Sequence, residues 1–158
     1  MSDLPIEDVG TYPRPPRLEK FSKPIKIVFA GLTIAETSDA WRVLETYHPP
    51  TYYLPPSAFA DGVLVPTQGS SMCEWKGRAS YFNILAAGKT ATQAAWCYKR
   101  PTQRFAAITD FISVYGEPMD ACFVNGQKIT PQPGNFYGGW VNSWITGPIK
   151  GAPGTTHW

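Results

Sequence analysis

The residue types best suited to chemistry lie together in residues 41–56, WRVLETYHPPTYYLPP. Arg42, Glu45 and His48 all occur in this stretch, and a histidine beside a carboxylate can serve as a general base near neutral pH. Its two Pro-Pro pairs fix φ at their own positions and push the residues before them towards extended geometry. We therefore expect a stiff, non-helical segment, which suits a binding wall or the rim of an active site.

The thiol of Cys73, three residues before Lys76, is a second candidate for chemistry. A nearby cation lowers the pKa of a thiol and increases the thiolate fraction. One interpretation is an enzyme of hydrolase or transferase type, with Cys73 as nucleophile, His48 as base and Glu45 or Arg42 as orienting group. The alternative is structural, because a cysteine at the head of a strand is often a small buried apolar residue.

Aromatic residues indicate a different kind of site. An aromatic-lined pocket with few polar groups is typical of small-molecule binding, although core packing also accounts for many aromatic side chains in a small β domain. A small-molecule-binding domain is the leading hypothesis, and a structural or interaction module is a further alternative. The candidate ligand-binding residues come from three segments: Arg42, Tyr52, Tyr53, Trp75, Lys76, Trp96 and Tyr98.

Composition limits the class of protein. With 158 residues, a hydrophobic share of 43% and a charged share of 16%, the chain is expected to form one ordered domain. Its 14 basic and 12 acidic residues form no run, so we expect no nucleic-acid partner. No apolar segment is long enough to span a bilayer, and the N-terminus lacks the pattern of a signal peptide, so we expect no membrane partner and a cytoplasmic location.

The three cysteines, Cys73, Cys97 and Cys122, have no CxxC spacing and are an odd set. They are expected to be reduced thiols rather than a disulfide frame or a zinc site. The sequence therefore predicts no metal and no cofactor.

Many glycines and prolines, 14 and 16, favour short strands joined by turns. Strands are predicted over residues 25–29, 32–36, 80–86 and 92–98. Turns at Ala30-Gly31 and Ala87-Gly88 are expected to join them into two hairpins, and Asn125-Gly126 predicts a third. Residues 40–46 suit a helix or a strand, and the proline-rich stretch that follows favours the strand. Residues 57–72 resemble a loop, and the spacing of Phe105 and Ile108 predicts one short helix over residues 102–109.

Long arms are predicted on both sides of this domain. Residues 1–24 hold five prolines and no apolar period, and residues 131–158 are rich in glycine, proline and tryptophan. We expect a domain over residues 25–130, with Trp140, Trp144 and Trp158 docking the C-terminal extension on the domain or on a partner. The terminal arms are candidates for the contact of a homodimer.

Several of these motifs, in this order, resemble the family called domain of unknown function four-two-seven. They are VLET at 43–46, HPP at 48–50, the tyrosine and proline pairs that follow, CEWKG at 73–77, and AW at 95–96. The resemblance implies a mainly β, β-tent-like fold of small antiparallel sheets, and no established activity. Relatives in this fold often hold zinc with four cysteines, which the three cysteines of this chain cannot supply.

Overall fold

A computed structural model describes residues 6–13, 16–73, 77–132 and 138–147, with residues 69–73 described through their backbone alone. Short strands in several small, mostly antiparallel sheets make up most of it. The predicted class, mainly β in a β-tent-like arrangement of small sheets, is confirmed.

The largest sheet has the strand order β10-β9-β8-β7. Its strands are β7 (Leu64–Cys73), β8 (Gly77–Ala86), β9 (Lys89–Tyr98) and β10 (Ser113–Val114). The predicted hairpin of β8 and β9 is confirmed, and Ala87 and Gly88 turn the chain with φ of 50° and 77°. The prediction of a loop over residues 57–72 is wrong from Leu64 onwards. Backbone pairing with β8 outweighs the polar local composition there.

A second sheet has the order β12-β11-β3-β4. It contains β3 (Ile25–Phe29), β4 (Leu32–Thr37), β11 (Ala121–Val124) and β12 (Gln127–Lys128). The predicted hairpins at Ala30-Gly31 and Asn125-Gly126 are both confirmed, because the residues at each turn have positive φ. Alternation along β3 buries Ile25, Ile27 and Phe29 on one face, as predicted.

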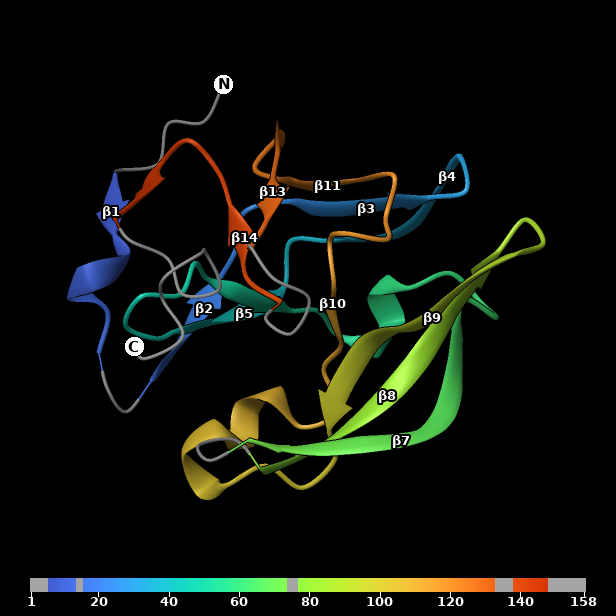
Figure 1. The fold of residues 1–158 in the computed structure, drawn as a ribbon, viewed down its shortest axis with the longest axis horizontal. Helices are drawn as coiled ribbons and strands as arrows, with labels where there is room; N and C mark the ends of the chain where they lie inside the picture. Colours follow the sequence, from blue (N-terminus) through green and yellow to red (C-terminus); the bar gives the residue numbers. More distant parts are fainter. Residues whose placement is uncertain (1–5, 14–15, 74–76, 133–137, 148–158) are drawn as a thin grey trace.

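A third sheet joins β2 (Arg17–Phe21), β5 (Ala40–Leu44) and β6 (Thr51–Tyr53) in the order β2-β5-β6. The strand interpretation of residues 40–46 is confirmed for β5. The proline-rich stretch supplies only the short strand β6, which pairs with β5 on one side. On its other side, Leu54 and Ile112 exchange two backbone hydrogen bonds of 2.8 and 2.7 Å. This bridge links the sheet to the segment that leads into β10 (Figure 1).

The helices are short 3₁₀ turns: η1 (Val9–Thr11), η2 (Pro56–Ala58) and η3 (Gln103–Ile108). The predicted helix over residues 102–109 is η3. It has a kink at Phe105, where φ is −111° and ψ is 21°, and both Phe105 and Ile108 are buried. Within the described residues, no helix has the length and apolar character that a membrane crossing requires.

Both ends of the chain contribute strands. β1 (Glu7–Asp8) pairs in parallel with β15 (Ile145–Thr146), and β13 (Thr130–Pro131) pairs with β14 (Trp140–Val141). Trp140 and Trp144 are each only 1% exposed, so the C-terminal extension docks on its own chain at these two residues. Trp158 lies outside the described residues. The domain boundaries at residues 24 and 130 stay predictions, although β2 belongs to the stretch expected to be an arm.

Candidate functional site

Three predicted ligand-binding residues, Tyr53, Trp96 and Tyr98, gather in one place. Alternation along β9 points Trp96 and Tyr98 to one side of the sheet, while Ala95 and Cys97 belong to the larger core on the other side. We call the smaller group of buried residues the aromatic cluster. Its members are Val43, Tyr53, Ala79, Trp96, Tyr98, Phe105 and Ile108.

The rings of the aromatic cluster are in direct contact. Tyr53 lies 6.4 Å from Trp96 in an edge-to-face arrangement and 6.3 Å from Tyr98, measured between ring centroids. Tyr115 lies 4.6 Å from Trp96. Burial raises the pKa of Tyr115, as do the charge of Tyr81 and a hydrogen bond with it. Tyr81, Tyr115 and Trp41 are half-buried and form an aromatic rim at the border of the cluster.

The backbone of Gly138 passes directly over the ring of Trp96. A Cβ at this position would lie 2.1 Å from the Cη2 atom of Trp96. At Gly139 a Cβ would lie 2.6 Å from the carbonyl oxygen of Pro49. Only glycine fits so close an approach, which explains the Gly-Gly pair before Trp140.

His48 links the proline-rich stretch to the C-terminal segment. The backbone N–H of Gly139 donates to Gln132 Oε1 at 3.2 Å. The nitrogen of the same side-chain amide, Nε2, is therefore the donor. This Nε2 lies 3.0 Å from His48 Nδ1, which therefore accepts the hydrogen bond. The ring proton then sits on Nε2, 4.0 Å from a carboxylate oxygen of Glu45. Both nitrogens of this buried ring face groups of the chain itself.

The thiols divide into two groups. Cys97 and Cys122 are free and buried, and burial raises the pKa of both thiols, that of Cys122 to about 12. They are therefore protonated and poor nucleophiles at neutral pH. The backbone of Cys73 ends β7 opposite Gly77. The side chain of Cys73, with Trp75 and Lys76, lies outside the described part of the structure, so the catalytic pairing with His48 stays a prediction.

Arg42 belongs to a different environment from the aromatic cluster. On β5 it stands between Glu19 of β2 and Tyr52 of β6, whereas Tyr53 pairs with its neighbour Trp41. Alternation therefore places Arg42 and Tyr52 on the face opposite Tyr53. Among the described members of the predicted set, Arg42 and Tyr53 do not share one surface, because Trp41, the neighbour of Arg42 on β5, is the residue that pairs with Tyr53 of β6.

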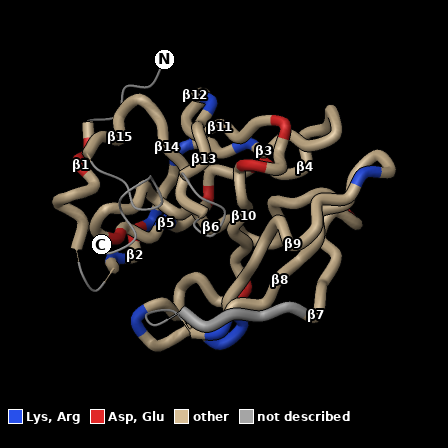
Figure 2. The backbone as a smooth tube through the Cα atoms, in the orientation of Figure 1, with Lys and Arg blue, Asp and Glu red and all other residues tan. Residues whose placement is uncertain are grey.

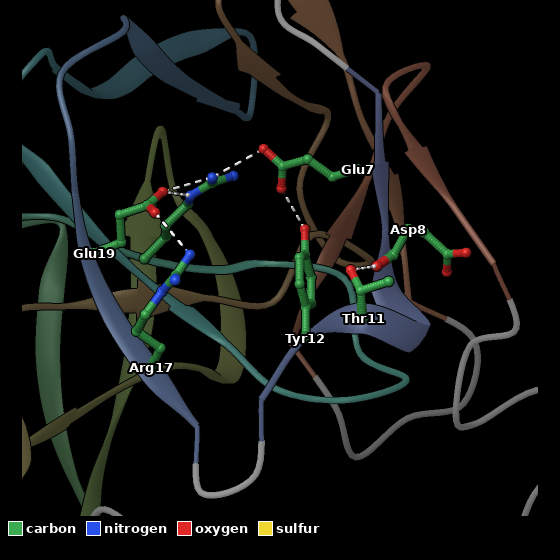
Figure 3. A network of polar contacts seen from close by, with 7 residues as sticks. Glu7, Asp8, Thr11, Tyr12, Arg17 and Glu19 are labelled. Atoms are coloured by element: carbon green, nitrogen blue, oxygen red, sulfur yellow. Dashed lines mark hydrogen bonds and ion pairs between the residues drawn. The ribbon is translucent and has the colours of Figure 1, made fainter.

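Arg42 is only 6% exposed, and its guanidinium binds two carboxylates. Its Nε donates to Glu19 Oε1 at 2.7 Å, and its Nη2 donates to Glu7 Oε2 at 3.0 Å. Burial lowers the pKa of Arg42, but the hydrogen bonds and negative charge of these partners raise it overall above its usual value. The network ties β1, β2 and β5 together (Figure 3).

Two tyrosines complete this network. Tyr12 donates to the second oxygen of Glu7 at 2.5 Å. Burial raises the pKa of Tyr52, and the positive charge of Arg42 partly offsets this effect. A side-chain hydrogen bond with Arg42 also lowers the pKa of Tyr52, which joins this tyrosine to the network. The network is partly buried and joins β1 to β2 and β5, so we expect it to hold the N-terminal segment in place.

Sequence analysis did not identify three residues that organise this region: Glu7, Gln132 and Gly138. Glu7 and Gln132 act through partners 35 and 84 residues away, and no local pattern marks such pairs. The Gly-Gly pair beside Trp140 is the one available signal, since paired glycines before a large aromatic residue are typical of a close backbone approach.

Charge is distributed unevenly around the aromatic cluster. Exposed basic residues lie at the start of β8, directly after β9 and in η3. Figure 2 shows Lys and Arg grouped near β7 and β8. They are Arg78, Lys99, Arg100 and Arg104. Within the described residues, no group of His, Cys, Asp and Glu could hold a metal ion.

Comparison with known proteins shows the family but no activity. No curated protein matches the chain. The family described as domain of unknown function DUF427 matches residues 17–125, from the start of β2 to the turn after β11. This match covers well over half of the sequence and all three of the larger sheets except the last strand, β12. The chain therefore belongs to the DUF427 family.

Proposed function

We propose that this protein binds a small molecule with a planar ring at the aromatic cluster. The observation that supports it is the aromatic rim: Trp41, Tyr81 and Tyr115 are half-buried and pack against the buried rings of the cluster. A planar ligand would stack on, or meet edge-to-face, aromatic side chains that packing already holds in position. Such a rim loses little side-chain entropy when the ligand binds.

The surrounding charge favours an anionic ligand. Arg104 lies in η3 next to Phe105, a member of the aromatic cluster. Lys99 and Arg100 follow Tyr98 directly, and all three cations are exposed. A cationic border raises the local concentration of anions and speeds their association. A planar ring that carries a carboxylate or phosphate therefore fits this region best.

Binding is favoured over catalysis by the surroundings of His48. Gln132 donates to one ring nitrogen, and the other faces Glu45. A general base must reach the proton of its substrate, and this ring serves to hold the C-terminal segment instead. The Cys73–His48 enzyme is the alternative, and alkylation of thiols distinguishes the two, since binding at the aromatic cluster does not depend on a thiol.

A thermal-shift screen with neutral and anionic ring compounds tests the proposal. A ligand at 100 times its Kd adds about 2.7 kcal/mol, which for a chain of this size corresponds to a rise of roughly 5–10 °C in Tm. Trp41→Ala should weaken binding of a positive compound at least tenfold. The matched control is Phe123→Ala, which removes a half-buried ring on β11, outside the cluster. Equal losses in both variants, or no stabilising compound, would count against the proposal.

A further inference from the structure

The outer edge of β7 differs from the other sheet edges. Exposed edges offer unpaired backbone groups to other chains, and proteins usually protect them with charge or by keeping the strand short. β2 has five residues and carries Arg17, Glu19 and Lys20. β4 has six residues with Glu36, and β12 has two residues with Lys128. Each of these edges is therefore protected.

β7 has neither kind of protection along most of its length. It is ten residues long, and its sequence, LVPTQGSSMC, contains no charged residue. Within the described part of the chain it pairs with β8 alone and forms the outermost strand of its sheet (Figure 1). In the half before Ser70, Pro66 and a shift of register interrupt regular pairing. From Ser70 to Cys73, four successive residues pair with β8 without a shift, which leaves a regular free edge.

We propose that this edge pairs with the β7 edge of a second copy of the chain. An antiparallel pair of identical strands is related by a two-fold axis, the commonest symmetry of homodimers. In an antiparallel pair, directly opposed residues point to the same face of the sheet, whereas neighbours along a strand point to opposite faces. The two-fold axis keeps each residue and its copy on the same face. One residue must therefore lie directly opposite its own copy. Within the regular stretch, that residue is Ser71 or Met72.

The absence of charge favours a second copy as the occupant. A charged residue on or near the axis would meet an identical charge on the partner strand, and like charges in directly opposed positions destabilise pairing. β7 avoids this conflict in every antiparallel register. The dimer would extend two four-stranded sheets into one continuous sheet of eight strands, and it would leave the aromatic cluster of each copy in place.

Sedimentation velocity over a range of concentrations tests the proposal. It is applied to the wild-type chain and to two variants that introduce opposite charges at Ser71. The apparent mass of the wild-type protein should rise with concentration to twice the 17.5 kDa of one chain. Ser71→Lys and Ser71→Glu should each raise the dimer Kd at least tenfold, because two identical charges come together. They are directly opposed if Ser71 lies on the axis, and they are diagonal neighbours on one face if Met72 does. An equimolar mixture of the two variants should recover the dimer, which a variant that fails to fold would not do.

Thr33→Lys is the matched control, because it adds the same charge to an exposed position of another edge strand, β4. It should leave the dimer intact. A wild-type chain that stays monomeric at several hundred micromolar would overturn the proposal. So would a dimer that tolerates both Ser71 variants, or a mixture that fails to recover, since either result places the contact elsewhere.

Discussion

Replacing Arg42 with methionine tests whether the buried network holds the N-terminal segment. Methionine retains much of the apolar stem of arginine but cannot bind the carboxylates of Glu7 and Glu19. The matched control is Arg17→Met. Arg17 contacts the same Glu19 at 3.2 Å from two residues earlier on β2, but its side chain is 62% exposed, whereas that of Arg42 is 8% exposed. The two variants differ mainly in burial.

The expected loss follows from that burial. Removing one partner of a buried ion pair destabilises a protein by about 3–5 kcal/mol, because the remaining charge stays without compensation. The side chains of Glu7 and Glu19 are 22% and 35% exposed, so water would partly solvate them after the change. We therefore expect about 3 kcal/mol for Arg42→Met. An exposed pair is worth about 0–1 kcal/mol, which is the expectation for Arg17→Met.

Urea unfolding at pH 7 measures both losses. In addition, amide exchange should become faster at Glu7, whose N–H donates to the carbonyl of Trp144 at 2.6 Å. That increase would show that the network connects the two ends of the chain through β1 and β15. Equal losses of stability for Arg42→Met and Arg17→Met, within about 0.5 kcal/mol, would refute the reasoning.

Three further predictions concern the packing around the aromatic cluster and the buried thiols. Gly138→Ala should cost about 1–3 kcal/mol and alter Trp96 fluorescence, because its methyl group overlaps the indole ring. Gln132→Ala should cost about 1–3 kcal/mol in urea unfolding, since it leaves buried hydrogen-bonding groups without partners. Burial raises the pKa of Cys122 to about 12, so the free energy of unfolding should fall as the unfolded thiol ionises above pH 9. By pH 11 this loss should reach about 2–3 kcal/mol relative to Cys122→Ala.

For each of these predictions, one result would contradict the reasoning. Gly116→Ala is the control for Gly138, because its nearest contacts would be 3.3 Å and involve side-chain atoms. Equal effects at the two glycines would contradict the close approach to Trp96. A Gln132→Ala variant as stable as wild type would remove the proposed link to His48. If wild type and Cys122→Ala lose stability in parallel above pH 9, the thiol does not cause the alkaline loss.

Local patterns predicted most of the strands. Alternation specified β3, and glycine-containing turns specified the hairpins of β3 with β4 and of β8 with β9. β7 was missed because its polar, glycine-containing sequence has no local strand signal, and the hydrogen bonds of β8 determine its structure. The short helix was predicted in the right place, but its sequence could not distinguish an α-helical turn from a 3₁₀ turn.

The candidate site was predictable where it depends on alternation within one strand. Trp96 and Tyr98, two residues apart, share a face as expected. Tyr52 and Tyr53 are adjacent, so a strand must send them to opposite faces, and only Tyr53 reaches the aromatic cluster. Contacts that depend on distant segments, such as Gln132 with His48, require the folded topology.

The indole N–H signals of the tryptophans in a proton–nitrogen NMR spectrum test the central proposal most directly. A ring compound identified by thermal shift would be titrated into the protein, with each signal assigned by substitution. Binding at the aromatic cluster predicts saturable shifts for Trp41 and Trp96, with Trp140 and Trp144 in the larger core nearly unchanged. Saturable shifts at Trp140 or Trp144, without any change at Trp41 and Trp96, would contradict the proposed binding site.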